Sequence, residues 1–182
     1  MISPSNVKFQ PPIPNGLIVN EGLGAKYSFV KGKTYRFRFI NFAALGSVMV
    51  HFDSHTMQVI MNDASYIQKK QAYQLRISSA QRYDVLISAI DRDSRNYPFL
   101  LSLDINRDWK NDPPAQLKWP YNVTGQLVMD PNGAYTQDVV EKWAPVEDSH
   151  FAPLDNAPAF EPVSRTIVLD FDFCRDVNNF PR

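Results

Sequence analysis

The chain has 182 residues, of which 44% are apolar and 21% charged, and it contains 14 Pro, 7 Gly and one Cys. That length suits one domain with a buried core plus a tail. Nineteen basic residues balance nineteen acidic ones, so we expect no nucleic-acid partner. There is no apolar run of about 18 residues and no signal-peptide pattern, so we expect no membrane insertion by this chain and no export signal in it.

Several chemistries are excluded or disfavoured by missing residues. The lone Cys174 excludes an internal disulfide, a zinc cage or an iron–sulfur cluster. The glycine-rich nucleotide motifs and the Gly-x-Ser-x-Gly nucleophile elbow are also absent. We therefore do not expect nucleotide chemistry or a serine nucleophile.

The chain opens with residues that favour extended structure. Prolines at 4, 11, 12 and 14 fix φ and lack backbone donors. Residues 1–15 are therefore expected to form an extended lead-in that ends in a turn at Asn15-Gly16.

After this lead-in the apolar residues recur with a period of two. In Thr34–Asn41, three aromatic residues share one face and two arginines the other, which is typical of a half-buried strand. The other predicted strands are Ala25–Val30, Val48–Phe52, Met57–Met61, Tyr73–Ile77, Tyr83–Ala89, Phe99–Leu103, Gly125–Met129 and Thr166–Phe171. Many short strands predict an all-β sandwich or barrel.

Helical signals are weak, and the pattern fades after residue 134. Asp138–Trp143 is expected to form at most one or two helical turns. From 135 to 164, prolines interrupt a stretch rich in Ala, Asp and Glu, so we expect an extended linker, at most with a short helix. Thr166–Phe171 has few residues after it to pair with, so we expect it to belong to a domain that this chain does not contain.

The histidines are His51, His55 and His150. A copper or zinc site usually uses two or three imidazoles, completed by Cys or carboxylate. In a continuous strand His51 and His55 would lie roughly 13 Å apart, although a turn at Asp53-Ser54 would bring them closer. We favour structural, hydrogen-bonded roles for His51 and His55, with a small copper site that uses all three histidines as the alternative.

Two further polar patterns carry predictions. Arg36, Arg38 and Arg76 project from polar strand faces, and we expect them to pair with Asp84 across the sheet. Asn122-Val123-Thr124 is an N-glycosylation sequon, which fits a secreted surface loop.

Four segments occur in a characteristic order and spacing. They are Asn15–Asn20, Lys33–Asn41, His55–Ile60 followed by Asp63, and Ala80–Leu86. Together they resemble the second, plastocyanin-like domain of three-domain multicopper oxidases, above all fungal iron-transport ferroxidases and laccases. Later segments extend the resemblance to nearly the whole chain. Gly125–Val128 resembles that domain's closing strand, and Thr166–Phe171 the first strand of domain three.

The resemblance implies a fold and a domain scheme. The fold is an all-β, cupredoxin-like Greek-key β-sandwich with an extended C-terminal linker. Residues 1–15 are the lead-in, 16–134 cupredoxin domain two, 135–164 an interdomain linker and 165–182 the start of a third cupredoxin domain. The partners are then the flanking cupredoxin domains, and the parent protein is secreted or at the cell surface.

The family also implies where the copper lies. Its oxidases bind blue copper through a His-Cys-His set in domain three, and a trinuclear cluster through His-x-His pairs of domains one and three. None of these motifs occurs here. The resemblance therefore implies a copper-free middle domain that is inactive alone, in a parent that oxidises phenolic substrates or ferrous iron and reduces dioxygen to water.

The substrate side of the resemblance is altered. The related ferroxidases carry a carboxylate just before the Pro-Ile-Pro that opens domain two. This chain has Gln10-Pro11-Pro12-Ile13-Pro14 there, so that carboxylate is absent. A second family aspartate corresponds to Asp112 only in one of two alignments, so Asp112 is a substrate-side candidate. The laccase acid in the loop matched by residues 43–47 is absent, and the usual Asp-Gly turn is Asp63-Ala64. A freestanding cupredoxin-like binding module without catalytic activity is the alternative.

Overall fold

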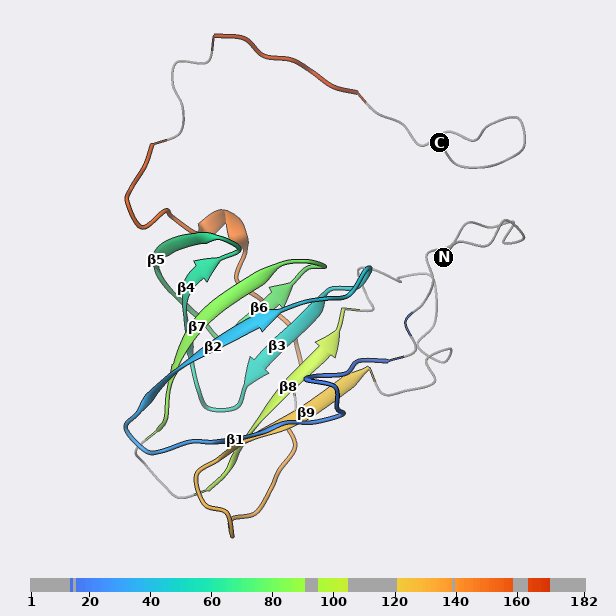
Figure 1. Ribbon diagram of the computed structural model, residues 1–182, viewed down its shortest axis with the longest axis vertical. Coiled ribbons are helices and arrows are strands. Elements are labelled where there is room, and N and C mark those ends of the chain that lie inside the picture. Colours follow the sequence, from blue (N-terminus) through green and yellow to red (C-terminus); the bar gives the residue numbers. More distant parts are fainter. Residues whose placement is uncertain are drawn as a thin grey trace, which may run out of the picture.

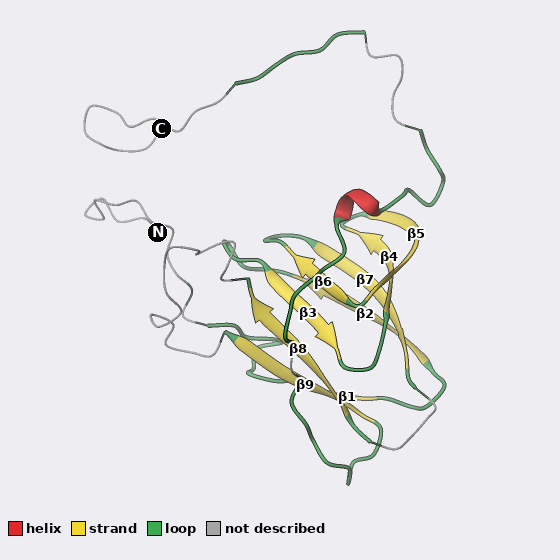
Figure 2. Ribbon diagram, turned by 180° about the vertical axis from the view of Figure 1, so that it is seen from behind, coloured by secondary structure: helices red, strands yellow, loops and turns green. Residues whose placement is uncertain are grey.

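The computed structural model describes residues 14, 16–90, 95–104, 121–138, 140–158 and 164–170. Nine strands within these ranges form two sheets around an apolar core, a cupredoxin-like β-sandwich (Figures 1 and 2). The strands are β1 (Lys26–Ser28), β2 (Thr34–Ile40), β3 (Val48–Phe52), β4 (Met57–Asn62), β5 (Ser65–Ala72), β6 (Gln74–Ile77), β7 (Arg82–Ser88), β8 (Tyr97–Leu103) and β9 (Asn122–Val128). The sheets have the orders β1-β9-β8-β3-β6 and β2-β7-β4-β5.

The predicted alternation holds in the strands that face the core. In β2, Tyr35, Phe37 and Phe39 pack against the core, while the residues between them are exposed. Their partners on the antiparallel strand β7 include Val85 opposite Phe37. Apolar side chains from both sheets therefore meet in one interior, which is the main stabilising term of such a sandwich.

Aromatic rings link the two sheets. Phe52 of β3 stacks on Phe99 of β8, with ring centroids 5.0 Å apart, and Phe37 of β2 meets Phe52 edge-on at 5.4 Å. Gly125 of β9 makes room for this cluster, because a Cβ there would lie 2.0 Å from Cζ of Phe99. A residue with any side chain at this position would collide with the ring.

Four sequence predictions need correction or completion. Strand β5 was missed, because only two of its eight residues are buried and the apolar alternation is weak. Residues 166–170 form no strand and are exposed, because no neighbouring strand supplies hydrogen bonds; residue 171 lies outside the described residues. Tyr73 precedes β6 and is exposed rather than facing the core. The described residues of 138–143 contain no helical turn; a 3-10 helix lies at Asp148–His150 instead.

The segment predicted as a linker packs against the sandwich. We call residues 134–138 and 140–154 the strap. It crosses the outer face of the β1-β9-β8-β3-β6 sheet (Figure 2). It then bonds to the edges of both sheets: Val146 N–H donates to the Gln74 carbonyl over 3.2 Å, and Leu154 N–H to the Tyr66 carbonyl over 3.1 Å.

The buried Asn96 fixes the turn that leads into the strap. Its amide oxygen accepts from the backbone N–H groups of Met129 and Asp130, at 2.9 and 3.0 Å. Its amide nitrogen donates to the carbonyls of Asp130 and Gly133, at 2.9 and 3.1 Å. One side chain therefore satisfies four backbone groups, and it is itself fully buried.

None of the helices among the described residues has the length and apolar character needed to cross a membrane.

Candidate functional site

His51 lies on the outer face of its sheet, under the strap. Its Nδ1 is 2.5 Å from Oδ2 of Asp138, whose side chain is 4% exposed, against 22% for His51. The pair fastens the first part of the strap to β3. Sequence analysis missed Asp138 as a partner, because 87 residues separate the two positions and no local pattern connects them.

His55 lies on the other side of the same sheet, inside the core. Its Nδ1 is 2.8 Å from the Asp53 carbonyl, across a turn in which Ser54 has a positive φ. Its ring meets Tyr97 edge-on at 4.8 Å and Phe29 at 5.8 Å. The turn therefore carries His55 away from His51, instead of toward it.

The third histidine, His150, ends the exposed 3-10 helix. The structure thus holds His51 and His55 in separate surroundings, each with its own polar contact. In the described ranges, no three His, Cys, Asp or Glu side chains gather as a metal site would require. Asp112, the substrate-side candidate, lies outside the described residues.

Asn122 of the sequon is the first residue of β9 and is exposed, whereas the next residue, Val123, is buried. Its register partner is Ser102 of β8. The backbone at Asn122 is therefore fixed, while the side chain is open to solvent.

The predicted cross-strand pairs form in part. Arg36 donates from Nε to Oδ2 of Asp84 over 2.7 Å and contacts the same oxygen with a second nitrogen, while Nε of Arg38 lies 3.6 Å from that oxygen. Hydrogen bonds to Tyr66 and then to Asp84 raise the pKa of Arg36 above its usual value. The prediction was wrong for Arg76, which lies in the other sheet and pairs with Asp104 at 2.8 Å.

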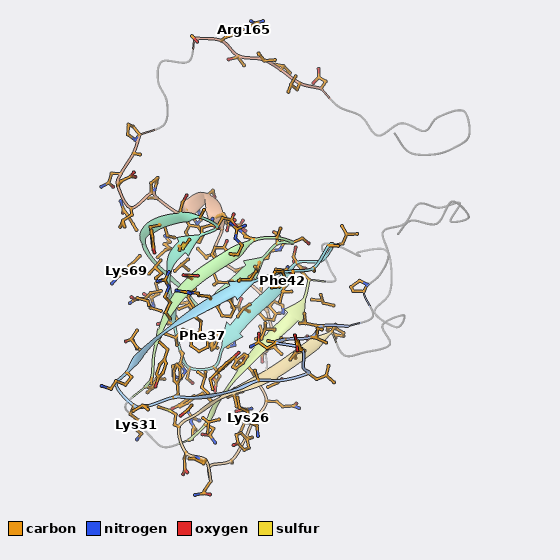
Figure 3. All side chains as sticks on the ribbon, in the orientation of Figure 1. Lys26, Lys31, Phe37, Phe42, Lys69 and Arg165 are labelled. Atoms are coloured by element: carbon orange, nitrogen blue, oxygen red, sulfur yellow. The ribbon has the colours of Figure 1, made fainter. Side chains whose placement is uncertain are left out.

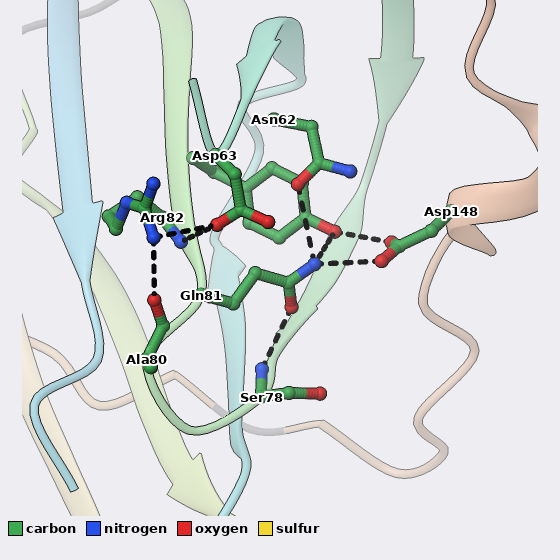
Figure 4. Close-up of polar contacts among 8 residues, drawn as sticks. Asn62, Asp63, Ser78, Ala80, Gln81, Arg82 and Asp148 are labelled. Carbon is green, nitrogen blue, oxygen red and sulfur yellow. Dashed lines mark hydrogen bonds and ion pairs between the residues drawn. The ribbon is translucent and has the colours of Figure 1, made fainter. Parts of the chain in front are cut away.

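A polar cluster joins the strap to β7 (Figure 4). The buried Tyr83 hydroxyl donates to Oδ1 of Asp148, and Nε2 of Gln81 donates to Oδ2 of Asp148 over 2.7 Å. The same Gln81 nitrogen lies 3.0 Å from the Tyr83 oxygen and 3.4 Å from Oδ1 of Asn62. Burial, followed by the hydrogen bond to Asp148, raises the pKa of Tyr83 far above its ordinary 10.0. We call Tyr83, Gln81 and Asp148 the latch.

The altered turn beside the latch avoids strain at Ala64. Asp63 adopts the positive φ of 51°, and Ala64 does not. Asp tolerates this region better than most residues, and the Asp63 carboxylate accepts from Arg82 N–H over 3.0 Å. Ala64 can therefore replace the usual glycine, because Asp63 and not Ala64 takes the positive φ.

The loop after β2 presents apolar side chains to solvent. Ile40, at the end of β2, and Phe42 and Leu45, in the loop, are 52%, 89% and 50% exposed. We call these three residues the knuckle; Phe42 is labelled in Figure 3. The buried Asn41 holds its base: the amide nitrogen donates to the Gly46 and Ile77 carbonyls, at 2.9 and 3.0 Å. A fixed loop with a nearly bare phenylalanine is a suitable surface for docking.

The described residues thus offer one internal latch, isolated histidines and an apolar knuckle. Together they suit mechanical support and contact with other protein surfaces. None of these groups combines a nucleophile, a base and an open cavity.

Comparison with known proteins identifies the family of this chain. The family described as multicopper oxidase matches residues 3–119. An iron transport multicopper oxidase FET3 of Gibberella zeae is 30% identical over 179 residues, covering 97% of this chain and 28% of that protein. The iron transport multicopper oxidase fio1 of Schizosaccharomyces pombe is 33% identical over 93 residues, covering 51% of this chain and 15% of that protein.

Solved structures show the same fold. Fet3p, a multicopper oxidase that functions in iron import, matches with a TM-score of 0.84 and 24% identity over 97% of this chain and 33% of its own. A laccase of Botrytis aclada matches with a TM-score of 0.52 and 28% identity over 65% of this chain and 21% of its own. The matched region is therefore between 15% and 33% of the length of these relatives. By sequence and fold, it belongs to the multicopper oxidase family.

Proposed function

We propose that this chain is the copper-free middle domain of a longer multicopper oxidase. The observation that carries the proposal is that His51, on β3, pairs with Asp138, whereas the buried His55, in the turn after β3, contacts the Asp53 carbonyl. Because the two imidazoles have different partners, we do not expect them to share one copper ion. The copper of the parent enzyme is then bound by residues of other domains.

The proposed division of the chain follows the sequence. Residues 16–134 are the second cupredoxin domain, 135–164 connect it to the next, and 165–182 begin a third. The family match over 3–119 and the 97% coverage of this chain by the Fet3p fold support this division. The strap belongs to the connecting segment, but it stays attached to the domain.

Two exposed apolar surfaces are the proposed contacts with the flanking domains. One is the knuckle. The other is the tail, residues 164–170, where Ile167, Val168 and Leu169 are all exposed. In a longer chain these surfaces would be covered, because bare apolar patches favour association.

The proposed parent activity is oxidation of ferrous iron or a phenol coupled to reduction of dioxygen to water. Relatives named for iron transport and for laccase activity support both substrates. Asp112 remains the proposed substrate-side acid. Secretion of the parent is proposed as well, and the exposed Asn122 would then carry a glycan.

Copper titration of the purified 182-residue chain tests the central proposal. We expect no stoichiometric copper and no blue absorbance after excess copper is removed. One tightly bound copper per chain would overturn it. His51→Ala and His55→Ala would then show which of the two histidines binds the metal.

A freestanding binding module is the second candidate. It is favoured by the strap, which caps the edges of both sheets from within the chain. This candidate predicts a monomer at high concentration. The middle-domain proposal predicts association that weakens when Phe42 is replaced by Ser.

A further inference from the structure

A β-sandwich has four outer strands, and an uncovered outer strand is a template for another chain. Here the outer strands are β1 and β6 of one sheet and β2 and β5 of the other. Strands β5 and β6 lie on the same side of the sandwich, because only Tyr73 separates them in the chain. The strap runs along this side.

Three of the outer strands have protection of their own. Strand β1 is only three residues long and carries Lys26. Strand β2 carries the outward-facing Arg36 and Arg38. The second half of β5 carries Lys69 and Lys70, and charged side chains disfavour pairing with a like edge.

The remaining edges are those that the strap covers. At β6, Gln74 accepts from Val146 N–H through its carbonyl and from Ala144 N–H through its side chain, at 3.2 and 2.5 Å. At the first half of β5, Gln68 N–H donates to the Ala152 carbonyl over 2.9 Å. The strap therefore occupies backbone and side-chain groups that a foreign strand would use.

The latch lies between these two attachment points. Asp148 precedes the contacts with β5 and follows those with β6, and both of its carboxylate oxygens accept hydrogen bonds. Phe151 adds an edge-on contact with the Tyr83 ring at 6.0 Å. Charge-assisted bonds to a buried hydroxyl are among the stronger polar contacts in proteins. Losing them would loosen the strap on both sides.

We propose that the strap is an edge guard, locked by Asp148, that prevents a second copy of this chain from adding a strand at β6 or at the first half of β5. Strand β6 depends on it most. It has no outward lysine, and its Arg76 is paired with Asp104. This proposal does not depend on whether the chain binds copper.

The test compares Asp148→Ala with the wild type and with Asp155→Ala. Asp155 is an exposed carboxylate just beyond the strap that accepts a hydrogen bond from the Ala157 N–H, so its replacement by Ala removes the same charge. Hydrogen exchange is measured at the amides of Val146, Gln68 and Leu154. In Asp148→Ala we expect exchange at least tenfold faster there, with the β7 and β8 amides unchanged.

Light scattering after size exclusion supplies the second readout. We expect Asp148→Ala to associate at concentrations where Asp155→Ala behaves like the wild type. The knuckle and the tail are identical in all three proteins, so any association through them appears equally in each. Strap amides that stay protected in Asp148→Ala, or faster exchange without association, would overturn the proposal.

A milder variant covers the case in which Asp148→Ala does not fold. Tyr83→Phe keeps the ring in the core and removes only the hydroxyl that bonds to Asp148. We expect faster hydrogen exchange at the same three amides and association of the chain, both weaker than in Asp148→Ala. Wild-type exchange and wild-type association in a folded Tyr83→Phe protein would count against the latch.

Discussion

The strap and the tail were both expected to lie outside the sandwich, yet only the tail does. The tail is rich in β-branched and apolar residues, and its described part is exposed and forms no strand. The strap is interrupted by Pro145 and Pro153 and contains no strand, but it bonds to both sheets. Strand propensity did not decide which segment joined the fold; available hydrogen-bond partners did.

The largest loss of stability should come from removing Asn96, which fixes the turn that leads into the strap. Asn96→Ala removes four hydrogen bonds between one buried side chain and the backbone. Because unsatisfied buried groups are costly, we expect a loss of about 3 kcal/mol in the free energy of unfolding. Urea denaturation measures it. A loss below about 1 kcal/mol would mean that water replaces the side chain.

The second-largest loss of stability should come from breaking the contact between Asp138 of the strap and His51 of β3. Asp138→Ala removes the buried partner of His51, and we expect a loss of about 1–2 kcal/mol. Trypsin should cut faster after Lys142, which lies in the strap. The matched control is Asp155→Ala, for which we expect neither change. Equal cutting of the two variants would show that this contact does not hold the strap.

Alkaline pH should weaken the latch. The pKa of Tyr83 is raised in the folded chain above its ordinary 10.0, so the unfolded chain loses this proton first. The stabilising contribution is therefore complete below pH 10 and is lost as pH rises above 10, by at most about 1.4 kcal/mol per pH unit. Denaturation of the wild type and of Tyr83→Phe at pH 8 and at pH 11 measures this contribution: the free energy of unfolding should decrease more in the wild type. An equal decrease in both proteins would contradict the prediction.

The smallest effect should come from the tail. Val168→Asp changes a residue that is 76% exposed and lies outside the strands, and we expect the free energy of unfolding to stay within about 0.5 kcal/mol. The same substitution should reduce association of the chain if the tail is a docking surface. A large destabilisation would show that the tail packs on the sandwich after all.

Sequence alone was sufficient for the apolar strands. The alternation of aromatic and arginine residues in β2 predicted its faces, because burial of one face is a local signal. Strand β5 was missed because at an outer position most of its side chains face water. Its existence depends on pairing with β4, which the residues of β5 do not encode by themselves.

The polar contacts were the hardest to foresee. The pairing of Arg36 with Asp84 was predicted because the two lie on facing polar strand faces, whereas Arg76 was given the wrong partner because its sheet was unknown. The latch joins positions 65 residues apart and has no spacing rule. The partner of His51 was missed for the same reason, because Asp138 lies 87 positions away, whereas the surroundings of His55 depend on the local turn at Ser54.

The attachment of the strap also sets how far the next part of the chain can travel. Leu154 is bonded to β5, so the chain advances only ten residues from there to residue 164, where the tail begins. Fully extended, ten residues reach about 34 Å. Any domain that followed would be held near this one at an effective concentration on the order of millimolar. A weak interface would then suffice to keep the two domains together.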